Sequence, residues 1–379
     1  MDAQVVARAE VAACDPRAAE EICARLGPGP FALVAVFIAP GPDLRAIVRD
    51  VDALLRGTPV IGCTTAGEIG ASGYVEGHIV AIGLSAHHFR AETLLIDNIS
   101  AIDPRALIGA LIRARGALAD AVPAWQHEFA FLLVDGLSTK EDELASALAA
   151  GMGPVPLFGG SAADGTRFLE TFVFHRGQVL RNAAVLAFVR TCCPVRVFKA
   201  DHLRPTDRRM VVTDADPARR IVRQINAEPA ALEYARLVGK DPHQLSPFTF
   251  AAHPVSVRIG GQHFVRSIRQ VADNHELVFY SAIDEGLVLT VAEAQDMTAH
   301  LESLMADLSH PSAPLAILAC DCILRRMEAE EKQLGRQVSD LLAQHRAVGF
   351  STYGEQFNAM HVNQTLTGVA FYAPEGVQP

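Results

Sequence analysis

Aromatic residues and long apolar runs are both scarce in this sequence. Only 6% of its 379 residues are aromatic, and it contains one tryptophan. The longest apolar stretch, FALVAVFIAP at residues 31–40, is much shorter than the roughly 18 residues of a membrane-spanning helix and fits a buried strand. The N-terminus also lacks a basic segment followed by an apolar one, so no signal peptide is expected. These absences favour a globular protein without a membrane segment.

Basic residues form no stripe, and the net charge is −10. This balance argues against nucleic acid as a partner. Seven cysteines is an odd number, and Cys192 and Cys193 are adjacent, so a disulfide framework is not expected. The cysteine usage therefore predicts a cytoplasmic location. Cys320 and Cys322 form a C-x-C pair, but no second pair lies nearby, which favours buried thiols over a zinc site.

Motifs of common enzyme classes are missing as well. The chain has no G-x-S-x-G elbow, H-E-x-x-H helix, Walker loop or G-x-G-x-x-G turn. We therefore predict no catalytic residues and a protein that is not an enzyme. A hydrolase that uses Ser161 or Thr64 is the weakest of the alternatives that remain.

One local pattern occurs three times. It reads IGCTTAGE at residues 61–68, FGGSAADG at 158–165 and VGFSTYGE at 348–355. Each copy follows a strand and a helix, runs from an apolar strand into a glycine and a hydroxyl or small residue, and precedes another strand. An internal repeat of this kind predicts that the three copies form equivalent strand-to-turn corners.

The pattern along the chain predicts an α+β fold with mixed and antiparallel sheets flanked by helices, built from repeated strand–helix–strand–hairpin units. We predict two domains, residues 30–195 and 215–373, joined by a looser segment at 191–215. In the second domain we expect a helix at 216–226, strands from 247 onward, and one long helix over 324–345. That helix either packs on a sheet or contacts a partner or a second copy.

The three corners have two possible roles. Backbone N–H groups beside Thr64, Ser161 and Ser351 could form a nest for a carboxylate. Alternatively, the glycines allow tight packing and the hydroxyls bond to nearby backbone, which is the commoner arrangement. Glu68 and Glu355 occupy equivalent positions. They could pair as acid and base, but exposed turn carboxylates are the commoner arrangement and the one expected here.

Five separated segments together resemble one known family. IGCTTAGE, FGGSAADG, RSI, LVFYSAIDEGLVL and GFSTYGE…HVNQTLTG are similar to the FIST family of bacterial sensory proteins, which pairs an N and a C domain. The form EQFNAMHVNQTLTG, without an attached kinase or cyclase, resembles the NosP-like subgroup. That resemblance implies a haem b protein that senses nitric oxide and adjusts a histidine kinase or a cyclic-di-GMP enzyme.

A haem sensor needs an iron ligand, and His253 is the first candidate. In an extended strand it shares a face with Val255, Val257 and Ile259, and the proline that follows restricts its backbone. A half-buried histidine bonded to backbone is the competing interpretation. The cations that could meet the haem propionates are Arg258, Arg266 and Arg269.

His361 is the second candidate for the ligand. Alternation places it on a polar line with Asn363 and Thr365, so it is expected to support a turn or a polar ligand. A second function stays open, a haem-free sensor that uses the glycine-rich turns to hold a small molecule with a carboxylate, such as an amino acid.

Overall fold

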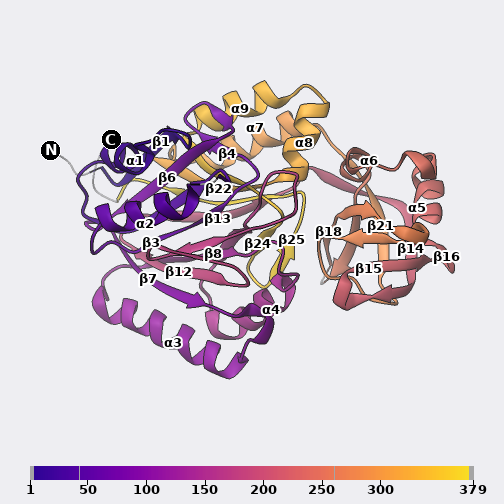
Figure 1. The fold of residues 1–379 in the computed structure, drawn as a ribbon, viewed down its shortest axis with the longest axis horizontal. Helices are drawn as coiled ribbons and strands as arrows, with labels where there is room; N and C mark the ends of the chain where they lie inside the picture. The colour runs from indigo at the N-terminus through magenta and orange to yellow at the C-terminus, as the bar shows by residue number, and fades with distance from the viewer. Residues whose placement is uncertain (1–3, 42, 260, 375–379) are drawn as a thin grey trace.

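The computed structural model describes residues 4–41, 43–259 and 261–374. It has a large body, residues 4–200 and 295–374, and a smaller domain, residues 203–294, inserted into it (Figure 1). Helices cover mixed and antiparallel sheets, so the predicted α+β class is confirmed. None of the helices in the described ranges combines the length and apolar character needed to cross a bilayer.

The body consists of three units with one element order. Each unit runs strand, helix, strand, helical segment, strand, hairpin, strand. The first unit contains β1 (Val6–Ala12), α1 (Ala18–Leu26), β2 (Phe31–Ile38), α2 (Leu44–Leu54), β3 (Val60–Thr64), β4 (Glu68–Gly70), β5 (Gly73–Val75) and β6 (His78–Ser85). The second contains β7 (Phe89–Ile96), α3 (Pro104–Ala121), β8 (His127–Val134), α4 (Glu141–Met152), β9 (Leu157–Ser161), β10 (Val173–His175), β11 (Gln178–Leu180) and β12 (Ala184–Thr191).

The third unit has the same order, interrupted once. The inserted domain separates its first strand from its first helix. It contains β13 (Val195–Ala200), α7 (Met297–Leu308), β22 (Ala316–Cys322), α8 (Ile323–Glu331), α9 (Gly335–Gln344), β23 (Ala347–Thr352), β24 (Glu355–Phe357), β25 (Met360–Val362) and β26 (Leu366–Phe371).

The units exchange their hairpins in a cycle. The three six-stranded sheets have the orders β1-β6-β2-β3-β10-β11, β7-β12-β8-β9-β24-β25 and β13-β26-β22-β23-β4-β5. In each sheet four strands come from one unit and the last two are the hairpin of another. The body therefore has an approximate internal threefold arrangement, and no unit completes its own sheet.

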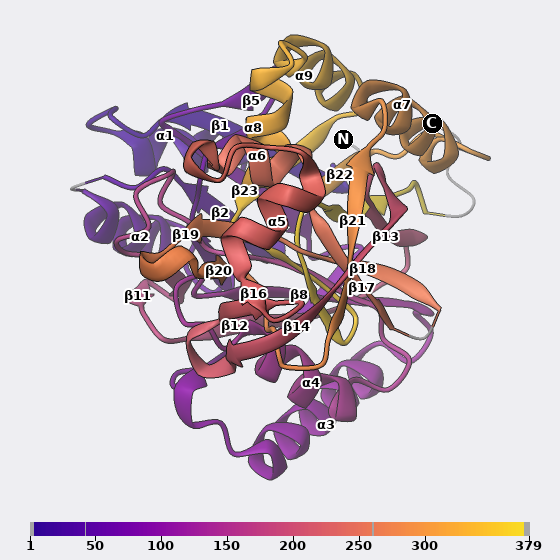
Figure 2. The same ribbon diagram turned by 90° about the vertical axis from the view of Figure 1, so that its right-hand side faces the viewer.

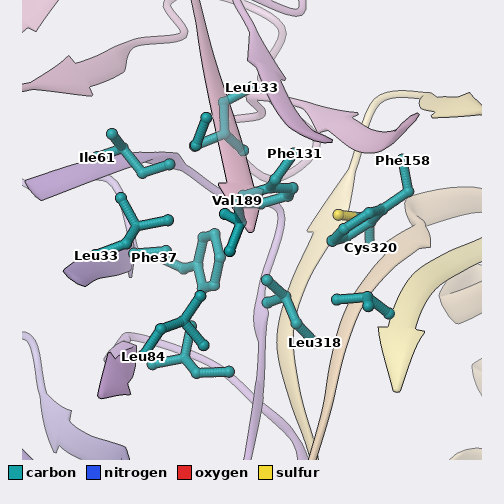
Figure 3. Close-up of a cluster of buried hydrophobic side chains, with 14 of the residues drawn as sticks. Leu33, Phe37, Ile61, Leu84, Phe131, Leu133, Phe158, Val189, Leu318 and Cys320 are labelled. Atoms are coloured by element: carbon teal, nitrogen blue, oxygen red, sulfur yellow. The ribbon is translucent and has the colours of Figure 1, made fainter. Parts of the chain in front are cut away.

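The three sheets enclose one apolar core. Leu33 and Phe37 from the first sheet, Phe131 and Phe158 from the second and Leu318 from the third point into it (Figure 3). The alternate residues of the same strands face outward against the helices of each unit. Because both faces are buried, strands such as β2 are continuous apolar runs rather than alternating ones.

The repeated motifs form equivalent corners, as the sequence predicts. In each unit the motif strand pairs in parallel with the strand just before the helical segment, so β3 pairs with β2, β9 with β8 and β23 with β22. Its glycine lies against the backbone of that neighbour. A Cβ at Gly62, Gly159 or Gly349 would lie 2.0, 2.1 or 1.8 Å from the carbonyl oxygen of Val36, Leu132 or Ala319. This close approach explains why all three copies carry glycine at this position.

The inserted domain has its own sheet and core (Figure 2). The sheet order is β18-β17-β21-β14-β15-β20-β19, with the short β16 beside β15. Its elements are β14 (Leu203–Asp216), β15 (Ile221–Ile225), β16 (Glu228–Pro229), α5 (Ala230–Val238), α6 (Pro247–Ala252), β17 (Val255–Ile259), β18 (Gln262–Arg266), β19 (Ile268–Val271), β20 (Leu277–Phe279) and β21 (Val288–Ala294).

Three local predictions in the C-terminal half are wrong. Residues 216–226, expected to be one α-helix, form a single 3-10 turn at Pro217–Arg219 and the strand β15. The expected strand from 247 starts instead with α6, because Ser246 caps it in a capping box with Thr249. The long helix over 324–345 is two helices, interrupted where Gln333 adopts a left-handed backbone with φ 57°. The domain ranges 30–195 and 215–373 stay predictions, since strand pairing describes architecture and not family boundaries.

Candidate functional site

The corners meet one another through their own backbone. A carbonyl oxygen in each corner accepts a hydrogen bond from an N–H of another corner, in a closed cycle. The bonds run from Ala163 N to Thr64 O (2.9 Å), from Tyr353 N to Ser161 O (3.3 Å) and from Ala66 N to Ser351 O (2.9 Å). Since these N–H groups are already bonded, the corners favour the packing role over an open nest.

Glu68 and Glu355 are fully buried, so the expectation of exposed turn carboxylates is wrong. Each carboxylate links the two ends of its own hairpin through hydrogen bonds. Glu68 accepts hydrogen bonds from Thr65 Oγ1 and, at 3.1 Å, from the backbone N of His78. Glu355 accepts from Thr352 Oγ1 and from both the backbone N and Oγ1 of Thr365, at 3.2 and 2.6 Å. Burial raises the pKa of Glu68 to about 7 and that of Glu355 to about 8.

Two hairpins with the same register carry different polar side chains. Tyr74 pairs with Ile69 in the first hairpin, and His361 pairs with Gln356 at the equivalent place in the third. Each side chain enters a buried polar network. The two networks can therefore be compared within one molecule.

The network around Tyr74 is closed. Its hydroxyl bonds to Asp321, which accepts from Arg325 Nε at 2.7 Å. Arg325 also donates to His202 Nδ1 at 2.8 Å, and His202 Nε2 bonds to Glu328 at 2.9 Å. Every one of these side chains has a partner, as expected for a network that only stabilises the fold.

The network around His361 is open. Seven buried side-chain atoms in it or beside it, on both sides of the domain interface, have no hydrogen-bond partner in the described part of the chain. We call these residues the interdomain cluster: Gln356 (Oε1), His361 (Nε2), Asn363 (Nδ2) and Gln364 (Oε1) of the body, and Arg266 (Nε), Ser267 (Oγ) and Arg269 (Nε) of the inserted domain. Unpartnered buried polar atoms are costly, so a concentration of them points to a missing ligand or to water.

His361 is neutral and presents a proton to the cluster. Gln356 Nε2 lies 3.2 Å from His361 Nδ1 and donates to it, which places the ring proton on Nε2. Burial lowers the pKa of His361 to about 3. Gly354 packs against the ring, because a Cβ there would lie 2.8 Å from both His361 Nε2 and Asn363 Nδ2. Two N–H donors therefore lie around one point beside Gly354.

Residues from both sides of the domain interface position the cluster. Asn363 Oδ1 accepts from the backbone N of Ser267 at 3.4 Å and from Ser281 Oγ. Arg266 Nη1 donates to the carbonyl oxygen of His361 at 2.9 Å. Gln364 Nε2 donates to the carbonyl oxygen of Ala251 at 3.1 Å. The site is thus shared between the body and the inserted domain.

The structure places His253 differently from the expected strand. It follows α6 as the C-terminal cap and is half-buried, with its Nδ1 unpartnered among the described residues. Burial, then Lys240 and Arg208, lower the pKa of its imidazole. Val255 and Val257 pack into the core of the inserted domain, whereas Ile259 is exposed.

The three predicted arginines do not surround His253 together. Arg258 is exposed near the end of β17. Arg266 is buried at the domain interface, and the guanidinium of Arg269 lies 4.9 Å from the ring centre of Phe168 in the body. Two of the three therefore belong to the interdomain cluster.

Both candidate histidines have polar surroundings in this arrangement. A porphyrin needs an apolar slot beside the imidazole. His253 has charged neighbours, and His361 is enclosed by amides, hydroxyls and Gly354. The described residues also contain no group of three or more His, Cys, Asp or Glu side chains that could hold a metal ion. Cys320 and Cys322 are buried, and burial raises the pKa of both thiols, as a core role requires.

Sequence reasoning singled out four of the seven cluster residues, namely His361, Asn363, Arg266 and Arg269, but missed the other three. Gln356, Gln364 and Ser267 lie within the repeated or family-like segments, and that was the signal available. What it could not indicate is that residues near 266 and near 361 face each other.

Comparison with known proteins identifies two family domains, and the boundary between them lies inside the inserted domain. The FIST N domain matches residues 32–228 and the FIST C domain matches residues 230–358. The chain belongs to the FIST family, whose domains are sensory modules of signalling proteins. A curated relative, the uncharacterized protein MJ1623 of Methanocaldococcus jannaschii, is 22% identical over 397 aligned positions, which cover 93% of this chain and 75% of that protein.

Proposed function

We propose that this protein is a sensor that binds a small polar molecule in the interdomain cluster. The observation that carries the proposal is the contrast between the two equivalent networks. The Tyr74 network has a partner for every group, and the His361 network leaves seven buried atoms without one in the described residues. A ligand between the two domains would supply the missing partners.

The unpartnered atoms indicate the chemistry of the ligand. His361 Nε2, Asn363 Nδ2 and the Nε atoms of two arginines are donors, and the arginines carry positive charge. Gln356 and Gln364 contribute unpartnered acceptor oxygens. A small molecule with an anionic group, such as a carboxylate, and a separate donor, such as an ammonium group, would satisfy both sets. An amino acid has this combination.

The sequence carries no recognised catalytic motif, so we expect the ligand-bound state to be signalled through a second protein. A ligand that holds the two domains in one arrangement would change the affinity for a partner that distinguishes that arrangement. A histidine kinase or a cyclic-di-GMP enzyme is the kind of partner that the family resemblance suggests.

The proposal predicts that one or more small carboxylates raise the melting temperature. The measurement is thermal unfolding with the twenty common amino acids, pyruvate, succinate and citrate as probes. Asn363→Ala should weaken binding of an active probe by about 10- to 100-fold, because a hydrogen bond to a charged group is lost. Gln178→Ala, an exposed amide on the equivalent hairpin of the second unit, is the matched control and should leave binding unchanged. If no probe stabilises the wild type, the carboxylate assignment is wrong.

Haem-based sensing of nitric oxide is a second proposal. It is favoured by the unpartnered ring nitrogens of His253 and His361, and it requires the polar surroundings of the ligating ring to rearrange around the porphyrin. Hemin titration followed by absorption spectroscopy tests it. A Soret band at one haem per chain that His253→Ala abolishes would support His253 as the ligand. Loss in His361→Ala instead would identify His361, and no stoichiometric binding would exclude the haem proposal.

A further inference from the structure

The interdomain cluster is closed to solvent. His361 is 1% exposed, and Asn363 and Ser267 are 0% exposed. A molecule from solution cannot reach them in this arrangement. We infer that the inserted domain is a hinged cover, which must swing away from the body to admit the ligand of the proposed function.

The two chain crossings form the hinge. Residues 201–202 enter the inserted domain and residues 295–296 leave it, side by side, since Gln295 N donates to the carbonyl oxygen of His202 at 2.7 Å. The side chain of His202 is fixed to the body by Glu328 and Arg325. The closed Tyr74 network therefore anchors the pivot about which the rest of the inserted domain would swing.

The core of the inserted domain does not continue into the body. Its apolar cluster contains only residues between Met210 and Val291, and a separate small cluster lies where Tyr280 meets Phe168. The centroids of these two rings are 6.0 Å apart. The interface consists of this small cluster, the packing of α6 against α8 and polar contacts, so it can separate without opening either core.

A charged latch holds the cover closed on the side of α4. Arg220 Nη2 lies 2.6 Å from Glu141 Oε2 and 3.4 Å from Asp142 Oδ2, and its Nη1 donates to the carbonyl oxygen of Tyr280. Asp142 also accepts from the backbone N of Ala282 at 2.9 Å. Arg220 has a left-handed backbone, with φ 56°, a conformation that non-glycine residues adopt at a cost. The latch thus links one arginine of the cover to the first turn of a body helix.

Hydrogen–deuterium exchange of the protein without ligand tests the cover. Both sides of the interface, residues 263–269 and 353–365, should exchange at a common rate that is faster than that of β8 and β22. Arg220→Ala should accelerate exchange on both sides by about a hundredfold, because Glu141 loses its buried partner. Asp142→Asn should accelerate the exchange of the same segments by a smaller factor. It provides the test if Arg220→Ala does not fold.

Arg223→Ala is the control. Its ion pairs to Asp214, Asp216 and Glu276 lie within the inserted domain, so interface exchange should not change. The cover is refuted if the interface exchanges as slowly as β8 and β22, or if both latch variants accelerate all segments alike. Because no ligand is used, this result is independent of the carboxylate screen. A moving cover with no active probe would refute only the proposed ligand.

Discussion

Gly159→Ala is expected to destabilise the protein severely, by about 3 kcal/mol or more. An added methyl group would lie 2.1 Å from the carbonyl oxygen of Leu132 and 3.0 Å from its Cβ. Both are parts of the paired strand β8, so the clash can be relieved only by separating two central strands. Gly62→Ala and Gly349→Ala should behave alike, because their clashes are equivalent. Denaturant unfolding followed by circular dichroism measures the loss.

Gly116→Ala is the matched control for these substitutions. Gly116 lies inside α3, and a Cβ there would meet no atom within 4 Å. Alanine should therefore stabilise the helix by about 0.5–1 kcal/mol. Equal effects of Gly116→Ala and Gly159→Ala would show that close strand packing is not the reason for the glycine in the motif.

Glu355→Gln is expected to make the protein more stable at alkaline pH. Burial raises the pKa of Glu355 in the folded protein to about 8, from an ordinary value of 4.5. The folded state therefore holds the proton more tightly than the unfolded state. Its stabilising effect is complete below about pH 4.5 and is lost as the pH rises through about 8. The difference corresponds to roughly 3–5 kcal/mol across that window.

Glutamine mimics the protonated carboxyl, since it still accepts from Thr365 and can donate to Thr352. Chemical unfolding at pH 5, 7 and 9 should show similar stabilities at pH 5, a clear advantage of the variant at pH 7 and the full advantage at pH 9, because the difference grows between the two pKa values and levels off above about 8. Glu68→Gln should show a smaller advantage, because its folded pKa is about 7. Glu331→Gln on the exposed surface of α8 is the control. If the free energy of unfolding depends on pH in the same way for the wild type and for Glu355→Gln, the carboxyl of Glu355 is not buried in its protonated form.

The repeat could be predicted from the sequence because its cause is local. Close pairing of the motif strand with its parallel neighbour requires glycine at one position in every copy, and both faces of β2 are buried, which makes it continuously apolar. Glu68 and Glu355 were misjudged for the opposite reason. Their burial depends on hairpins that bring His78 and Thr365, each ten residues further along the chain, against the two carboxylates. No local sequence pattern indicates these contacts.

Spacing and residue type within short segments were enough to predict the α+β class, the three equivalent corners and the family to which the chain belongs. Tertiary structure alone decided which hairpin completes which sheet and where residues 203–294 enter the third unit. It also decided that Ser267 lies against Asn363, 96 positions away along the chain. The candidate site belongs to this second group, because its unpartnered atoms come from two domains and become a site only when those domains meet.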